Sequence, residues 1–159
     1  MNASLAPVTA IATTDPTERQ RALVDAHVAA VNRHDWAAVT AGFDGASPEF
    51  EIVPAGVRLH GIDGVETAWR MLSTALPDLS IAVRRGVDAP GCSVREVRMT
   101  GTHLGEYFGM PRSGRRVGID MACFFEFDAD GRLRCERLYF DNGALLRQMA
   151  SAADAPEAH

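Results

Sequence analysis

Apolar residues in the first half of the chain recur at the spacing of helices. A first helix is predicted with one apolar face, formed by Leu23, Val24, His27, Val28 and Val31. Asp15 and Pro16 mark its start, because a capping side chain followed by proline is typical of a helix N-terminus. Two more helices are predicted, with apolar faces formed by Trp36, Val39 and Phe43 and by Val65, Ala68, Trp69 and Leu72.

The second half has the pattern of β-strands. Runs rich in β-branched and aromatic residues alternate with turns, and Asp130-Gly131 is a typical hairpin turn. A short helix is predicted at the end, over 145–149. The predicted strands cover 50–53, 79–85, 93–103, 117–127 and 132–140. Helices followed by long antiparallel strands indicate an α+β fold, in which three helices lie across a curved antiparallel sheet and enclose a conical cavity.

Length and composition fit one domain. The chain has 159 residues, 47% hydrophobic and 23% charged, so we expect a domain over 15–150 between disordered segments at 1–14 and 151–159. No apolar run reaches the about 20 residues of a membrane-spanning helix, and no secretion signal is evident, which predicts a cytoplasmic protein. The net charge of −5 argues against nucleic acid as a partner.

Cysteine and histidine spacing gives no sign of a disulfide framework or a metal site. Cys92, Cys123 and Cys135 are odd in number and lack the paired spacing of zinc ligands, so we expect reduced thiols. His27 and His34 have no carboxylate at ligand spacing, and we therefore expect no bound metal.

Several short motifs stand out along the predicted domain. They are Asn32-Arg33-His34-Asp35-Trp36, Gly61-Ile62-Asp63-Gly64-Val65, Gly101-Thr102-His103-Leu104-Gly105-Glu106-Tyr107, Gly114-Arg115-Arg116-Val117, and Tyr139-Phe140-Asp141 followed by Leu145-Leu146-Arg147-Gln148. In this order they resemble the SnoaL-like polyketide cyclases of the nuclear transport factor 2-like superfamily. The resemblance implies an α+β barrel and a cofactor-free enzyme that acts on a small, largely apolar molecule through one or two acid/base side chains. The superfamily also includes binding proteins without catalysis, so fold alone does not decide function.

The last predicted strand carries the first candidate catalytic group. Side-chain alternation puts Glu136 on one face with Leu138 and Phe140, the apolar face that lines the cavity. A carboxyl group in such surroundings suits general acid/base chemistry. The alternative is an exposed glutamate paired with an arginine.

The resemblance also points to a departure on this strand. SnoaL-like cyclases and related epoxide hydrolases have a catalytic aspartate there, at a position that aligns with Leu138. Its absence argues against aldol-type cyclisation and the usual epoxide hydrolysis. Glu136 would instead resemble the members that open an epoxide with a His/Glu pair to close a pyran or furan ring. Asp141 is the other candidate acid, and its alternative role is an N-cap of the last helix.

His103 is the candidate partner of Glu136. It ends the predicted strand 93–103, and histidine accepts and returns protons near neutral pH. One member of the pair would take a proton from a substrate hydroxyl while the other donates to the opening epoxide oxygen. The alternative is a histidine that holds the following loop by a hydrogen bond.

Apolar and aromatic side chains form the predicted cavity wall, although each also suits an ordinary core. The resemblance would place a tyrosine or other polar group where this chain has Phe50, and Tyr107 could replace that donor. The candidate substrate-binding residues are Phe50, Ile52, Trp69, Met99, Tyr107, Phe108, Met121, Cys123, Phe125, Leu138 and Phe140.

Residues and resemblance together predict a cofactor-independent cyclase of polyketide-type specialised metabolism, such as antibiotic biosynthesis. The candidate catalytic residues are His103, Glu136 and Asp141. A homodimer through the outer face of the sheet is expected, with neither nucleic acid nor membrane as a partner. The alternatives are an epoxide hydrolase, a ketosteroid-isomerase-like proton shuttle, and a small-molecule-binding protein without catalysis.

Overall fold

The structure, a computed structural model, describes residues 15–43 and 47–150, which contain four α-helices and a curved six-stranded sheet. This is the α+β architecture that the sequence predicts. The helices are α1 (Pro16–Asn32), α2 (Trp36–Ala41), α3 (Gly61–Ala75) and α4 (Asn142–Ala150). The strands are β1 (Glu49–Ile52), β2 (Val57–His60), β3 (Ser80–Ala89), β4 (Cys92–Thr102), β5 (Arg116–Phe127) and β6 (Leu133–Phe140).

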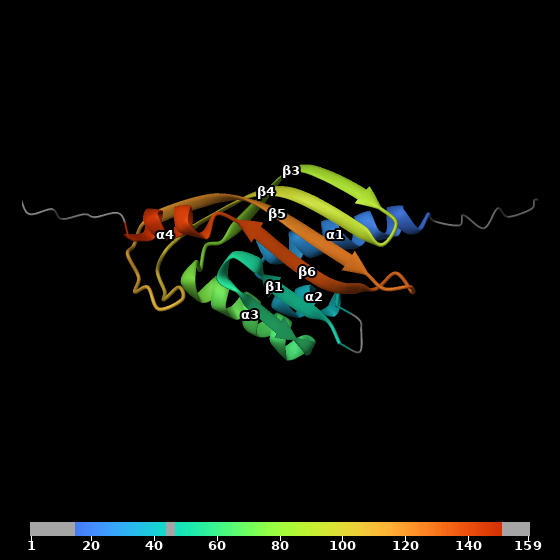
Figure 1. Ribbon diagram of the computed structural model, residues 1–159, viewed down its shortest axis with the longest axis horizontal. Coiled ribbons are helices and arrows are strands. Elements are labelled where there is room, and N and C mark those ends of the chain that lie inside the picture. The colour runs from blue at the N-terminus through green and yellow to red at the C-terminus, as the bar shows by residue number, and fades with distance from the viewer. Residues whose placement is uncertain (1–14, 44–46, 151–159) are drawn as a thin grey trace, which may run out of the picture.

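The strand order is β2-β1-β6-β5-β4-β3, so the last strand lies near the middle of the sheet. The sheet is not purely antiparallel as predicted, because β1 and β6 run parallel. Parallel neighbours need a long crossover, which α3 and the four intervening strands provide. In Figure 1, α1 and α2 lie behind the sheet, α3 lies beside β1 and β2, and α4 lies at one end.

Strand β2 was not predicted from the sequence. A 3₁₀ turn at Val53–Ala55 follows β1, and Gly56 then adopts a φ of 66°, a left-handed conformation that glycine tolerates well. This turn reverses the chain, so the four residues of β2 pair antiparallel with β1. So short an edge strand has too few alternating positions to show in the sequence pattern.

Side-chain amides attach α1 to the free edge of β3. The Asn32 amide donates to the Ile81 carbonyl at 2.8 Å and accepts from the Ile81 N–H at 2.7 Å. At the other end of the helix, Gln20 donates to the Ala89 carbonyl and accepts from Gly91, both at 3.0 Å. Two such contacts satisfy edge groups of the strand and hold α1 across the concave side of the sheet.

Other motif residues also have structural roles. His34 binds the Leu79 carbonyl through Nε2 at 2.9 Å. Gly105 leaves no room for a side chain, because a Cβ there would lie 2.1 Å from the Thr74 carbonyl oxygen.

The helix starts predicted from the sequence are capped only in part. Asp35 accepts from the Ala38 N–H at 3.1 Å and caps α2, whereas Asp15 precedes α1 without a side-chain capping bond.

Cys92, Cys123 and Cys135 are free cysteines, and the described residues contain no group of three or more potential metal-ligating side chains. None of the helices in these ranges is long and apolar enough to cross a membrane. The terminal segments predicted to be disordered, 1–14 and 151–159, lie outside the described residues.

Candidate active site

Glu136 lies on the concave, helix-covered face of the sheet and is 2% exposed. Its strand neighbours in the register are Phe50 on β1 and Phe125 on β5, and both are buried. Glu136 and Leu138 are buried, whereas Tyr139 on the opposite face is exposed, which confirms the predicted alternation along β6. The carboxyl group therefore belongs to the interior of the domain.

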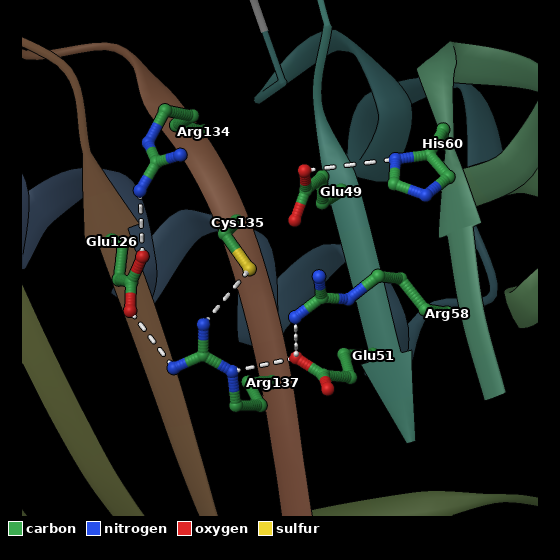
Figure 2. A network of polar contacts seen from close by, with 8 residues as sticks. All are labelled: Glu49, Glu51, Arg58, His60, Glu126, Arg134, Cys135 and Arg137. Carbon is green, nitrogen blue, oxygen red and sulfur yellow. Dashed lines mark hydrogen bonds and ion pairs between the residues drawn. The ribbon is translucent and has the colours of Figure 1, made fainter. Parts of the chain in front are cut away.

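The opposite face of β6 carries a different kind of chemistry. Arg137 donates to Glu51 at 2.8 Å and to Glu126 at 2.9 Å, so it bridges β1 and β5 across β6 (Figure 2). Its hydrogen bonds to Glu51 and then to Glu126 raise the pKa of Arg137 further above its usual range. The charged side chains on the outer face thus pair with one another, and Arg137 is not available to neutralise Glu136.

The partner of Glu136 is His27 on α1. His27 is 4% exposed, and its Nε2 lies 3.0 Å from Glu136 Oε2. The separation is that of an ion pair, yet the alignment falls short of a hydrogen bond, and neither atom has another hydrogen-bond partner in the protein. The pair joins the first helix to the last strand and brings an acid and a base into contact in the interior of the domain.

Aromatic rings enclose the His27 imidazole. Its ring centroid lies 5.7 Å from Phe43, 5.5 Å from Phe125 and 6.0 Å from Trp69, in edge-on or tilted arrangements. Such surroundings exclude bulk water, and a low local dielectric strengthens the interaction between a carboxylate and an imidazolium. His27 and Glu136 are thus placed to exchange a proton with each other or with a bound molecule.

The space beside the pair is small. It has a volume of about 10 Å³ and is lined by His27, Val28, Val31, Trp69, Ile81, Arg95, Val97, Cys123, Phe125 and Glu136. The predicted cone is therefore largely filled by side chains beside His27 and Glu136, because several large apolar residues converge there. That volume admits about one water-sized atom.

A larger pocket of about 510 Å³ is lined mainly by residues of α3 and of the segment 106–108. Ile52 on its wall is two residues along β1 from Phe50, the register partner of Glu136, but no described residue lines both spaces. Arg70 and Glu106 line it, together with Ile52, Thr67, Met71, Leu72, Thr74, Tyr107 and Phe108. The larger volume and the buried acid/base pair therefore lie in two separate spaces.

His103 does not meet Glu136. The register matches Glu136 with Phe125 and Phe125 with Ser93. His103 is ten residues beyond Ser93, directly after the end of β4, which is roughly 30 Å along an extended strand. The expected pairing of these two residues is therefore wrong, because the sheet is longer than a small substrate. His103 is fully buried and its Nδ1 lies 3.0 Å from Ser113 Oγ, as expected for the alternative role of holding the loop.

Asp141 has the geometry of the alternative proposed for it. Its Oδ1 accepts from the Ala144 N–H at 2.8 Å, at the start of α4, and its side chain is largely exposed. This is the arrangement of an N-cap. Asp141 follows the end of β6 and does not line the space beside Glu136, so the structure does not bring it to the His27–Glu136 pair.

The predicted wall residues are divided between the two spaces and the core. Trp69, Cys123 and Phe125 line the space beside the pair, whereas Ile52, Tyr107 and Phe108 line the larger pocket. Phe108 is 42% exposed at the wall of the larger pocket. Buried in the core, but lining neither space, are Phe50, Met99 and Leu138, with Phe140 partly buried against them; Met121 is buried and lines a separate surface pocket.

Two titratable wall residues are neutral at physiological pH. Burial, followed by the negative charge of Glu136, raises the pKa of the Cys123 thiol, so Cys123 stays protonated. Burial also raises the pKa of Tyr107 to about 12, and its hydroxyl donates to Asn142 at 3.0 Å. Tyr107 therefore holds α4 and is not free to replace the donor missing at Phe50.

His27 is the functional candidate that sequence reasoning missed. It was weighed only as a metal ligand, yet it belongs to the apolar stripe of the first helix. A histidine within a buried stripe must find a polar partner from elsewhere in the fold. That signal was present in the sequence, but it does not name the partner.

The chain resembles known proteins in both sequence and structure. The family model described as SnoaL-like polyketide cyclase matches residues 21–149. Solved structures with a similar fold include a SnoaL-like protein from Jannaschia sp. CCS1, with 21% identity and a TM-score of 0.73 over 87% of this chain and 96% of that one. An LEH-like epoxide hydrolase from M. tuberculosis has 21% identity and a TM-score of 0.67 over 85% and 92%. A protein with a ketosteroid isomerase-like fold from Catenulispora acidiphila has 14% identity and a TM-score of 0.68 over 80% and 91%. No curated protein matches significantly.

Proposed function

The chain belongs to the SnoaL-like polyketide cyclase family, and from this premise we propose that it closes a ring in a small, largely apolar molecule by acid/base catalysis. His27 and Glu136 are the proton-transfer pair in this proposal. The polyketide-type substrate follows from the family description and from the apolar surroundings of the pair.

The observation that carries the proposal is the 3.0 Å contact between two buried ionisable groups. Burying an acid and a base among aromatic rings costs solvation free energy, and apolar residues of similar size would fill the same space at less cost. An acid and a base held side by side suit general acid/base catalysis. A structural role alone gives no reason for both nitrogens of His27 to lack a hydrogen bond.

The reaction that suits the pair is an isomerisation. A substrate hydroxyl loses its proton to one member of the pair and its oxygen forms a bond to an epoxide carbon. The bond between that carbon and the epoxide oxygen breaks, and the epoxide oxygen takes a proton from the other member. No atom is gained or lost, and the dry surroundings favour attack by the internal hydroxyl over attack by water.

The substrate needs more room than the space beside the pair offers. Trp69 lines that space and Leu72, less than one helical turn later on α3, lines the larger pocket. We therefore place the body of the substrate in the larger pocket, with its reacting end beside His27 and Glu136. Rearrangement of the apolar side chains between the two spaces would admit that end.

A linear hydroxy epoxide that can close to a furan- or pyran-type ring tests the proposal in isotopically labelled water. Ring closure yields an isomer without the label, whereas an epoxide hydrolase would incorporate one labelled oxygen. General acid/base groups contribute roughly 10²- to 10⁴-fold, so His27→Gln and Glu136→Gln should each lower kcat by that order.

The chain supplies a matched control for these variants. His60 and Glu49 form a surface pair at 3.6 Å on the outer side of the sheet (Figure 2). His60→Gln and Glu49→Gln remove the same chemical groups and should leave kcat unchanged. Equal activity of the buried and surface variants would overturn the assignment of the pair, and absence of turnover across a panel of hydroxy epoxides would overturn ring closure by epoxide opening.

A further inference from the structure

Buried polar atoms that make no hydrogen bond gather at one point in the interior. Among the described residues, the buried side-chain nitrogens and oxygens without a hydrogen bond are His27 Nδ1 and Nε2, Trp69 Nε1, Glu136 Oε2 and His103 Nε2. All except the His103 atom belong to residues that line the same space of about 10 Å³. Buried polar groups are almost always hydrogen-bonded, so such a concentration indicates a polar guest.

Trp69 is the member of this group that the proposed reaction does not use. It lies on the buried face of α3, is 2% exposed, and packs against Trp36 with ring centroids 5.8 Å apart. Its ring also meets Phe50 edge-on at 5.5 Å. Packing on both sides fixes the indole, and an indole N–H can only donate a hydrogen bond.

The donor and acceptor inventory limits what the guest can be. It must accept from the Trp69 N–H, and it must donate to Glu136 when that side chain is a carboxylate. A carbonyl oxygen cannot donate, and an ammonium group cannot accept. A hydroxyl oxygen does both, and the space admits an atom of about that size.

We propose that His27, Trp69 and Glu136 form a binding site for a single hydroxyl oxygen, which the Trp69 indole N–H holds in place against the pair. The hydroxyl belongs either to water or to an organic molecule bound in the larger pocket. The binding site stands independently of turnover, whereas its role in catalysis rests on the proposed function.

Trp69 gains importance when the hydroxyl loses its proton. Negative charge then grows on the oxygen that the indole N–H contacts, and a fixed donor stabilises that charge without reorganising. Trp69 would thereby hold the attacking oxygen and stabilise it, while His27 and Glu136 move the protons.

Nuclear magnetic resonance on nitrogen-labelled protein tests the site directly. The chain has 2 tryptophans, so the spectrum holds two indole N–H signals, and Trp36→Phe assigns them. We expect a cross-relaxation peak between the Trp69 indole proton and a bound water, which methanol displaces with a saturable shift of the Trp69 signal. Acetonitrile, which accepts but cannot donate, should produce no saturable shift.

The two sources of the hydroxyl give different results. A water peak that persists at high methanol identifies a water site, and its replacement by the methanol shift identifies a site that takes organic hydroxyls. Either result supports a hydroxyl site. Absence of both, or an equal response from Trp36, would overturn it.

Replacement of Trp69 by β-(3-benzothienyl)alanine separates this inference from the proposed function. The sulfur analogue keeps the ring size and removes only the N–H, and we expect kcat to fall about 10- to 100-fold with a smaller change in KM. Full activity of this variant, while Glu136→Gln is inactive, would overturn the role of Trp69 and leave the proposed function standing. Conversely, if Glu136→Gln is active and the Trp69 water peak is intact, the proposed function is overturned and the hydroxyl site remains.

Discussion

His27 Nε2 and Glu136 Oε2 lie 3.0 Å apart, although one residue is on the first helix and the other on the last strand. The contact exists because β6 inserts between β1 and β5, directly beneath the face that α1 covers. An acid and a base that are remote in the chain thus share one apolar enclosure, and each of the following predictions concerns this enclosure or the contacts that frame it.

Replacing His27 and Glu136 by leucine, singly and together, should show how the pair affects the free energy of unfolding. Breaking a buried ion pair leaves one polar group without a partner, so Glu136→Leu or His27→Leu alone should lower the free energy of unfolding by about 2 to 4 kcal/mol. The double variant should come within about 1 kcal/mol of the wild type, because no orphaned group remains. Urea unfolding of all four proteins measures this coupling, and purely additive losses would contradict it.

His103 should matter for the loop that follows β4. His103→Ala removes a buried ring that contacts Ser113, and we expect a loss of about 2 to 3 kcal/mol in unfolding free energy. Turnover per folded molecule should stay near the wild-type rate, because the register keeps His103 remote from Glu136. A loss of kcat as large as that of Glu136→Gln would show that His103 takes part in catalysis after all.

Asp141 should behave as a helix cap. Asp141→Ala removes the acceptor for the Ala144 N–H and should cost about 1 kcal/mol of stability. Asn also caps well, so Asp141→Asn should retain both stability and turnover. A catalytic aspartate would fail in both variants, and thermal unfolding with a turnover assay on the same samples distinguishes the two outcomes.

Asp88 should couple the stability of the domain to acid pH. Burial opposes its charge, but hydrogen bonds from Ser93, Arg21 and Arg95 lower its pKa from 3.8 to about 2. Because the folded-state pKa is the lower one, the stabilisation is complete above the ordinary value and is lost as the pH falls toward 2.

Asp88→Asn should therefore cost about 1 to 2 kcal/mol at neutral pH, a figure that allows for screening by solvent. The difference from the wild type should narrow between pH 4 and pH 2, as protonation abolishes the same charge. Unfolding curves across this range measure it, and a constant difference would contradict the assignment. Arg95 also lines the space beside Glu136, so loss of its partner Asp88 should lower turnover as well.

Much of the fold could be predicted because helices, strands and turns each produce a local pattern of apolar and polar residues. The stripe that contains Leu23 and Val24 gives α1, the alternation around Leu138 gives the inward face of β6, and Gly131, with a φ of 77°, closes the predicted hairpin. These features depend only on the period of one helix or strand. The order of the motifs along the chain indicated the family, which the pattern of a single helix or strand could not indicate.

The partner of Glu136 could not be predicted, and His103 was the wrong choice. The alternation of side chains predicts an inward-facing position for both His103 and Glu136, but facing inward leaves the position along the sheet open. That position depends on the strand register, on the parallel pairing of β1 with β6, and on the way α1 crosses the sheet. None of these long-range relations is encoded in the spacing of neighbouring residues.

The sequence by itself determined the class of fold, the family and the buried face on which Glu136 stands. Only the tertiary structure decided that His27 meets it, that Asp141 caps a helix instead, and that the interior is filled to about 10 Å³ beside the pair. The physical reason is that periodicity reports which side of an element is apolar, whereas distance and packing arise when elements far apart in the chain come together.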